Sequence, residues 1–134
     1  MKKSKNDFVT EIDKRSEKLI ISRIKKSFPG HGVLAEESGS DDGEEALWII
    51  DPLDGTSNYI HQLPMFSVSI GVMQKGALVA GVVYDPLHQE LFTATKGYGA
   101  YLNRKRIHVT RVKKLADGLM ATGIRPLVAP LGLA

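Results

Sequence analysis

Two aspartates separated by two residues are the first feature of the sequence that could do chemistry. Asp51 and Asp54 directly follow a run of apolar residues, and Gly55 comes next. Carboxylates this close repel each other unless a cation lies between them, and oxygen ligands without histidine or cysteine suit Mg²⁺ rather than zinc. Glu36, after the preceding apolar run, could supply a third oxygen. The pattern predicts a Mg²⁺ site; a β-turn closed by Asx hydrogen bonds is the alternative from spacing alone.

Hydroxyl and amide side chains follow the two aspartates immediately. The segment Gly55-Thr56-Ser57-Asn58 is suited to capping a helix, whose first backbone N–H groups have no partner within the helix. Free N–H groups at such an end bind phosphate. A cation beside an anion-binding helix end is the arrangement that binds a phosphomonoester and stabilises charge during in-line displacement. The segment therefore favours phosphate-ester chemistry.

The elements that must position these residues follow from the spacing of apolar side chains. Apolar residues three and four apart, with charges between them, predict an amphipathic helix over residues 7–28. Pro29 and Gly30 end it. A short apolar run, residues 33–35, then leads into Glu36.

The next stretch predicts a loop followed by a strand. Residues 38–45 are acidic and contain glycine, which is typical of a surface loop. Residues 46–50 are apolar on both faces, as expected of a buried strand. Asp51 and Asp54 should therefore lie at the end of that strand.

The rest of the sequence changes to short runs of β-branched and aromatic residues divided by turn residues. Four such runs predict an antiparallel meander, and they cover residues 66–73, 77–84, 90–95 and 101–109. Together with the helix, this pattern predicts an α+β domain in which an antiparallel sheet packs with helices.

Composition limits the possible classes of protein. The sequence has 134 residues, 43% of them hydrophobic, and no cysteine, which excludes disulfide frameworks, zinc–thiolate sites and cysteine nucleophiles. The absence of cysteine fits a cytoplasmic location, and no apolar run is long enough to suggest a membrane partner. Basic residues gather at 23–26 and 104–114, and the net charge is +3. Nucleic-acid binding is disfavoured because no aromatic residues are interleaved with these clusters.

Residues 48–64, WIIDPLDGTSNYIHQLP, resemble the first signature of the inositol monophosphatase family, which is close to W-x-[IV]-D-P-[IL]-D-G-T-x-N-[FY]-x-H-x-x-P. Other segments similar to the family are residues 9–13, 34–38, 81–86 and 94–100. Ala35 departs from the glycine that is usual in the second of these. The likeness extends to about Gly123. It implies the N-terminal portion of the layered sandwich shared by inositol monophosphatases and fructose bisphosphatases.

The resemblance implies a set of metal ligands. Glu36, Asp51 and the carbonyl oxygen of Leu53 would hold one Mg²⁺. Asp51 and Asp54 would begin a second metal site.

The resemblance also implies substrate-binding and catalytic roles. The substrate-binding residues would be Asp54, Gly55, Thr56 and Ser57, with backbone N–H groups of Gly55 and Thr56 donated to the phosphate. Thr56, paired with Asp13, would orient and help to deprotonate a metal-activated water that attacks the phosphorus directly. Asp13 could instead belong to a helix N-cap pair.

The implied protein is a Mg²⁺-dependent phosphomonoesterase, a hydrolase that acts on inositol monophosphate or related sugar and polyol phosphates. The resemblance implies a cytoplasmic homodimer for the full-length family. Fructose-1,6-bisphosphatase-type activity is a further alternative.

One family feature is missing from the sequence. The second signature, a Trp-Asp that completes the second metal site, does not occur, because Trp48 is the only tryptophan. Residues 1–124 are therefore interpreted as the metal- and phosphate-binding portion, and residues 125–134 as an atypical tail that a truncation or frameshift would produce. Such a chain should expose apolar surface and self-associate. A non-catalytic remnant or interaction module that retains a metal site is the alternative.

Overall fold

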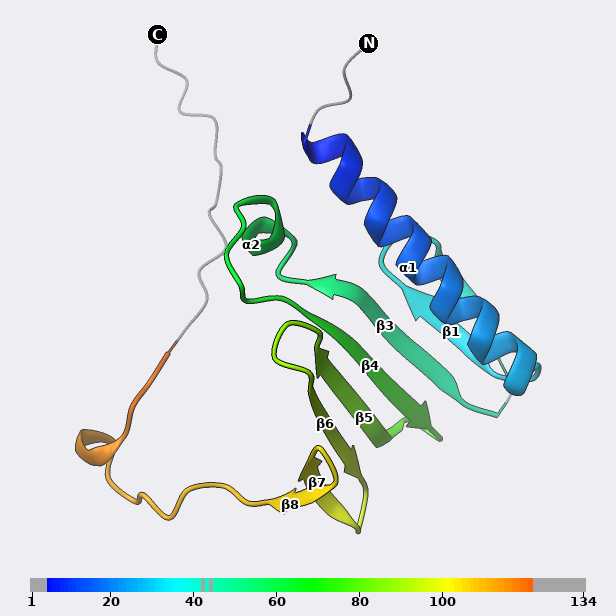
Figure 1. Ribbon diagram of the computed structural model, residues 1–134. Coiled ribbons are helices and arrows are strands. Elements are labelled where there is room, and N and C mark those ends of the chain that lie inside the picture. The colour runs from blue at the N-terminus through cyan, green and yellow to red at the C-terminus, as the bar shows by residue number, and fades with distance from the viewer. Residues whose placement is uncertain (1–4, 42, 44, 122–134) are drawn as a thin grey trace, which may run out of the picture.

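A long helix, α1 (Lys5–Ser27), lies across one end of an eight-stranded sheet, and a short helix, α2 (Thr56–Ile60), lies beside it (Figure 1). The structure is a computed structural model that describes residues 5–41, 43 and 45–121, with the backbone alone for residues 5–10. The predicted tail, residues 125–134, lies outside the described residues. The arrangement confirms the predicted α+β class.

The helix α1 begins two residues before the predicted helix over 7–28 and ends one residue before its predicted end. The N–H of Phe28 donates to the carbonyl oxygen of Ile24 (2.7 Å) and closes the last turn. Pro29 cannot extend this ladder because it has no N–H. Within the described ranges, no helix is both long and apolar enough to cross a membrane.

The strands form one sheet in the order β2-β1-β3-β4-β5-β6-β7-β8. They are β1 (Gly32–Ala35), β2 (Gly39–Asp41), β3 (Leu47–Asp54), β4 (Ser67–Gln74), β5 (Ala77–Asp85), β6 (Glu90–Thr95), β7 (Gly99–Leu102) and β8 (Lys105–Ile107). Strands β1 and β3 are parallel, and every other neighbouring pair is antiparallel. The predicted meander is therefore confirmed, and the sheet as a whole is mixed.

The last predicted strand, residues 101–109, is wrong in its extent. It divides into β7 and β8, which pair through a turn at Asn103 and Arg104. Both turn residues have positive φ (46° and 69°), a conformation that non-glycine residues adopt rarely and that reverses the chain here. Neither residue is a glycine, so the sequence does not clearly indicate a turn between the two strands.

The predicted loop over residues 38–45 is also wrong in part, because residues 39–41 form β2. Val33 is opposite Asp41, and Ala35 is opposite Gly39. Pairing of β2 satisfies the outer edge of β1, whose backbone N–H and C=O groups would otherwise lack partners. All three residues of β2 are exposed, so the sequence has no apolar pattern that would indicate a strand here.

The strand predicted over residues 46–50 continues to Asp54 as β3. Pro52 lies within it, at a shift of register between Asp51 and Asp54 where the ladder needs no N–H. Leu47, Trp48 and Ile49 are only partly buried, because α1 covers one face of this strand. The two aspartates therefore occupy an irregular strand end rather than the loop after it.

The core lies between α1 and the first strands of the sheet. Ile24 packs with Val33, Ala35 and Ile50, and all four are buried. Partly buried apolar residues extend this cluster, namely Ile20, Ile21, Trp48 and Ile70. Among the residues that the structure describes, no large side chain is completely buried. The core is therefore thin and confined to one end of the sheet.

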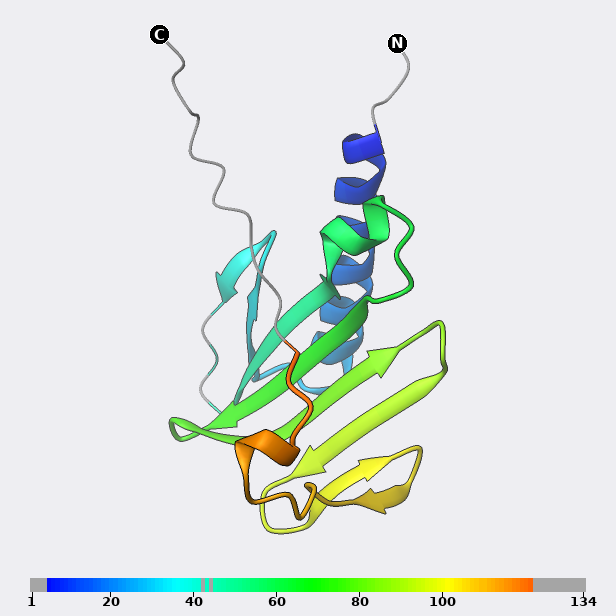
Figure 2. The same ribbon diagram turned by 90° about the vertical axis from the view of Figure 1, so that its left-hand side faces the viewer.

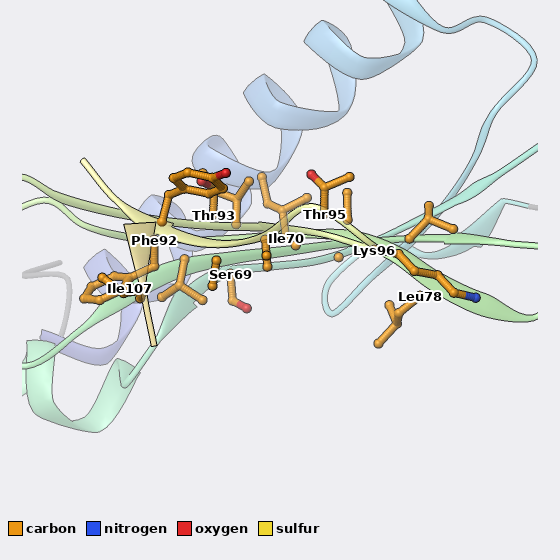
Figure 3. Close-up of a pocket in the computed structure, with 18 of the residues that line it drawn as sticks. Ser69, Ile70, Leu78, Phe92, Thr93, Thr95, Lys96 and Ile107 are labelled. Carbon is orange, nitrogen blue, oxygen red and sulfur yellow. The ribbon is translucent and has the colours of Figure 1, made fainter. Parts of the chain in front are cut away.

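Strands β5–β8 extend away from α1, and in the described part of the chain neither of their faces is covered by an α-helix (Figure 2). A hollow of about 760 Å³ lies over β4–β8. In Figure 3, Thr93 and Thr95 project from the face of the sheet nearer α1, whereas Leu78 projects from the opposite face. Leu78 is 63% exposed. These strands thus present apolar surface, as the sequence led us to expect.

Ile24→Ala should lower the free energy of unfolding by about 2–4 kcal/mol, because it opens a cavity between α1 and the sheet. Ile24 is 6% exposed, and Leu19 on the same helix is 61% exposed. Leu19→Ala is the matched control and should change stability by no more than about 0.5 kcal/mol. Urea unfolding followed by Trp48 fluorescence measures both. Equal losses in the two variants would contradict the placement of the core.

Candidate functional site

Acidic side chains from three elements meet where β1 and β3 end. Because these strands are parallel, their C-terminal ends lie at the same edge of the sheet. Ala35 is opposite Ile50 in this pair, so Glu36 and Asp51 follow at adjacent positions. Helix α1 brings Asp13 to the same edge, close enough for both carboxylates to influence its charge. The predicted residues Glu36, Asp51 and Asp13 are therefore brought together from distant parts of the sequence.

Asp13 carries the clearest electrostatic signature of this site. The pKa of Asp13 is raised from 3.8 to about 6, chiefly by burial and then by the nearby carboxylates of Glu37, Glu36, Asp51 and Glu17, in that order of influence. Its Oδ1 atom is buried and, within the described ranges, has no hydrogen-bond partner. A buried carboxylate oxygen without a donor is costly, and a cation or a proton would satisfy it.

Glu17 is a member of the site that the sequence reasoning missed. It is 2% exposed, and its Oε2 accepts a hydrogen bond from the backbone N–H of Glu37 (2.9 Å). The Glu37 side chain contacts Lys14 Nζ at 3.6 Å. These contacts tie the turn after β1 to α1. The available signal was spacing, because Glu17 follows Asp13 by four residues and so lies on the same helix face.

Asp51 shows both of the properties that its spacing predicted. Its Oδ1 accepts a hydrogen bond from the N–H of Leu53 (3.1 Å), which is the Asx bond of the alternative interpretation. Burial nevertheless raises the pKa of Asp51; the Leu53 N–H lowers it, and the charge of Asp54 raises it. The Asx bond and the repulsion between the two carboxylates therefore coexist.

The predicted partner of Thr56 differs from the one observed. Its Oγ1 donates to the carbonyl oxygen of Leu53 (2.9 Å) rather than to Asp13. This bond holds the Leu53 carbonyl, the predicted backbone ligand, against the first turn of α2. The hydroxyl of Thr56 thereby orients a group of the site instead of capping a helix N–H.

Gly55 makes the turn between the aspartates and α2 possible. Its φ is +92°, and a Cβ at this position would lie 2.9 Å from the carbonyl oxygen of Met65. Only glycine satisfies both demands. The helix α2 follows as predicted, with the N–H of Tyr59 donating to the Gly55 carbonyl (3.0 Å).

The predicted side-chain capping of α2 is wrong. Its N-cap has no side-chain hydrogen bond, and the amide of Asn58 instead donates to the carbonyl oxygen of Met65 (2.8 Å). Ser57 is exposed in the first turn. The start of α2 thus presents backbone rather than side-chain donors.

The donor set fits Mg²⁺ in chemical type and in charge. Glu36, Asp51, Asp54 and the Leu53 carbonyl offer only oxygen, and the unpartnered Asp13 oxygen marks a deficit of positive charge. In the part of the chain that is described, no three acidic or histidine side chains are already gathered closely enough to hold a metal ion. The ligand set therefore stays a prediction, and the feature that supports it is a buried carboxylate oxygen of Asp13 that a cation could satisfy.

A hollow of about 530 Å³ adjoins these residues, and Asp54 and Gly55 line one side of it. The larger hollow over β4–β8 is lined by none of the predicted site residues. Of these two hollows, the smaller one reaches the candidate site, through Asp54 and Gly55.

Comparisons with known proteins agree with this geometry. The sequence model of the inositol monophosphatase family matches residues 1–130. The Nus factor SuhB of Pasteurella multocida is 50% identical over 123 residues, which covers 90% of this chain and 46% of that protein.

Solved structures give the same result for the fold. The extragenic suppressor protein suhB from Bartonella henselae has a TM-score of 0.80 at 43% identity, covering 83% of this chain and 48% of that chain. An inositol monophosphatase from Anabaena has a TM-score of 0.74 at 47% identity, covering 81% of this chain and 44% of that chain. The chain spans about half the length of the relatives that it matches.

Gly55→Ala should destabilise the protein more than Gly76→Ala. Both glycines have positive φ (+92° and +74°), but an added Cβ meets the Met65 carbonyl only at Gly55, whereas nothing lies within 4 Å at Gly76. Backbone strain alone costs about 1–2 kcal/mol, which is the loss expected for Gly76→Ala. Chemical denaturation of both variants provides the comparison. An equal loss would show that the close approach at Gly55 is unimportant.

The raised pKa of Asp13 predicts that stability falls as pH rises. The unfolded chain loses this proton near 3.8 and the folded chain near 6, so the penalty develops between these values and is fully present above the second. Asp13→Asn should remove the penalty and stabilise the chain at neutral pH by on the order of 1 kcal/mol, after allowance for solvent screening. Urea unfolding across this range, with the exposed Asp117→Asn as control, measures it. A wild-type profile identical to that of Asp13→Asn would refute the assignment.

Proposed function

The chain belongs to the inositol monophosphatase family, and we propose that it is the metal- and phosphate-binding part of a Mg²⁺-dependent phosphomonoesterase. One observation carries the proposal. The buried oxygen of Asp13, which has no hydrogen-bond partner among the described residues, lies among repelling carboxylates that include Asp51, and Asp51 is followed four residues later by the glycine turn that opens α2. This arrangement favours a cation next to an anion.

The acidic residues would hold the cation. Glu36, Asp51 and Asp54, with the carbonyl oxygen of Leu53, are oxygen donors of the kind that Mg²⁺ prefers. When bound there, Mg²⁺ would neutralise the phosphate oxygens and lower the pKa of a water molecule. The hydrogen bond from Thr56 Oγ1 supports this role, because it fixes the direction of the Leu53 carbonyl.

The turn after Asp54 would bind the phosphate. Gly55, Thr56 and Ser57 supply backbone N–H groups at the start of α2, which has no side-chain cap to compete for them. Asp54, exposed at the end of β3, would contact the ester.

Asp13 is suited to move a proton. Its Oδ1 is buried and has no hydrogen-bond partner among the described residues, so this oxygen is available to accept a proton. The proposal assigns Asp13 as the general base. The Thr56 hydroxyl, held by Leu53, would orient the group that Asp13 deprotonates.

The substrate proposed for the longer protein is inositol monophosphate or a related sugar or polyol phosphate, and its proposed assembly is a homodimer. These assignments rest on family membership and on the phosphate-binding turn. Fructose-1,6-bisphosphatase-type activity requires the same turn and a second anion site.

A non-catalytic module that retains a metal site is the second candidate. It is favoured by the name of relatives at 50% identity, Nus factor SuhB, which specifies no hydrolase. Mg²⁺ binding without turnover distinguishes this candidate from the enzyme.

Purified protein should bind Mg²⁺ and release phosphate from inositol 1-phosphate only when Mg²⁺ is present. Asp51→Asn should reduce release by about a hundredfold or more, because it removes a charged ligand that opposes the developing phosphate charge. Calorimetry measures binding, and a phosphate assay measures release. Asp117→Asn, remote from the site, is the control.

Two outcomes would contradict the enzyme proposal in different ways. Mg²⁺ binding that Asp51→Asn abolishes, with no phosphate release, would support the non-catalytic module. Release that is unchanged by Asp51→Asn or by removal of Mg²⁺ would exclude the assigned site altogether.

A further inference from the structure

The turn that carries Glu36 lies at the edge of the sheet, between β1 and β2. Its residues, 36–38, are all exposed, and Ala35 is opposite Gly39 where the two strands meet. Strand β2 is the last strand on this side of the sheet. The ladder with β3 holds the chain only as far as Ala35, which is opposite Ile50. The direction of Glu36, a proposed metal ligand, therefore depends on what holds this turn.

A hydrogen bond to α1 holds the turn immediately after Glu36. Oε2 of Glu17 accepts the backbone N–H of Glu37 at 2.9 Å. This N–H and the carbonyl group of Glu36 belong to one planar peptide unit, which begins at the Cα of Glu36. Fixing the N–H therefore fixes the orientation of that unit. Because the ladder with β3 holds the preceding residue, the backbone is held on both sides of the proposed ligand.

The burial of Glu17 indicates a role beyond packing. The residue is only 2% exposed, although it carries a carboxylate. A buried carboxylate costs free energy that an apolar side chain of similar size would avoid. Glu17 also adds negative charge near Asp13, whose pKa is raised chiefly by burial and in part by Glu17. A cost of this kind is expected at positions that serve function.

A second contact between α1 and the same turn is weaker. Nζ of Lys14 lies 3.6 Å from Oε2 of Glu37, and the lysine side chain is 53% exposed. An exposed ion pair of this kind contributes at most about 1 kcal/mol. It also ends on the Glu37 side chain, which can rotate without moving the peptide unit. Glu17 is therefore the group that orients the backbone.

We propose that Glu17 is a positioning residue, which orients Glu36 toward the cation by fixing the peptide unit between Glu36 and Glu37. The inference rests on the proposed function, because the direction of Glu36 matters only if Glu36 is a metal ligand. The role is positioning rather than catalysis, since the observed contact of Glu17 is with the backbone beside a predicted ligand. The feature that the site needs is the acceptor oxygen of Glu17 and not its charge.

Glu17→Gln and Glu17→Met test this role as a matched pair. Both side chains are uncharged and close to glutamate in length, but glutamine keeps an oxygen that can accept the Glu37 N–H, whereas a thioether is a weak acceptor. Calorimetry should show that Mg²⁺ binds Glu17→Met about tenfold more weakly than Glu17→Gln, as expected when a group that orients a metal ligand is lost. In the metal-free chains, hydrogen exchange at the Glu37 amide should be faster in Glu17→Met.

Two further variants separate positioning from other effects. Gly76→Ala loses stability in the turn between β4 and β5, at the opposite end of these strands from the site, and should keep the Mg²⁺ affinity of the unchanged chain. Lys14→Gln breaks the ion pair with Glu37 and should not weaken Mg²⁺ binding. A loss in either control as large as the loss in Glu17→Met would overturn the positioning role.

The matched pair also distinguishes failure of this inference from failure of the proposed function. Equal Mg²⁺ affinity in Glu17→Gln and Glu17→Met, or equal exchange at the Glu37 amide, would overturn the positioning role while leaving the metal site in place. Failure of Mg²⁺ to bind the unchanged chain would overturn the proposed function and the role of Glu17 with it.

Discussion

The candidate site depends on the parallel pairing of β1 with β3. This pairing brings the C-terminal ends of both strands to one edge of the sheet, and its register makes Glu36 and Asp51 neighbours. An antiparallel pair would have sent one of these carboxylates to the far end of the molecule. Helix α1 packs its apolar stripe on the same strands, which delivers Asp13 to the same edge. A backbone arrangement therefore creates the local excess of negative charge.

A few hydrogen bonds to the backbone offset part of this excess of negative charge. Glu17 is buried yet bonded to the backbone of the turn after β1, and one oxygen of Asp51 is bonded to the backbone of Leu53. The oxygen of Asp13 has no such bond within the described residues, which separates it from the other two. Acids with a hydrogen-bonded oxygen support a structure, whereas a buried oxygen without a donor is a place where function imposes a cost.

The features predicted correctly from the sequence are those determined by neighbouring residues. The α1 periodicity, the meander and the glycine turn at Gly55 each depend on a local pattern of side chains or on one backbone conformation. The buried Glu17 was not predicted, because its partner, the N–H of Glu37, is brought near only by tertiary structure. Strand β2 and the hydroxyl bond of Thr56 have partners close in the sequence, but β2 has no apolar pattern and the residue type of Thr56 does not determine which backbone group its hydroxyl contacts. Asp51 shows that the local and the tertiary interpretation of a residue can both hold, since it makes an Asx bond and also lies among repelling charges.

The order of strands also bears on how the site is assembled in time. From β4 to β8 each strand pairs with the next one along the chain, so only short loops must close. The contact of α1 with β3 joins segments that are farther apart in the sequence, because β1 and β2 lie between them. Loop-closure entropy therefore favours early formation of the meander and late docking of the helix. Asp13, the proposed general base, would therefore reach the carboxylates at the ends of β1 and β3 in the last step of folding.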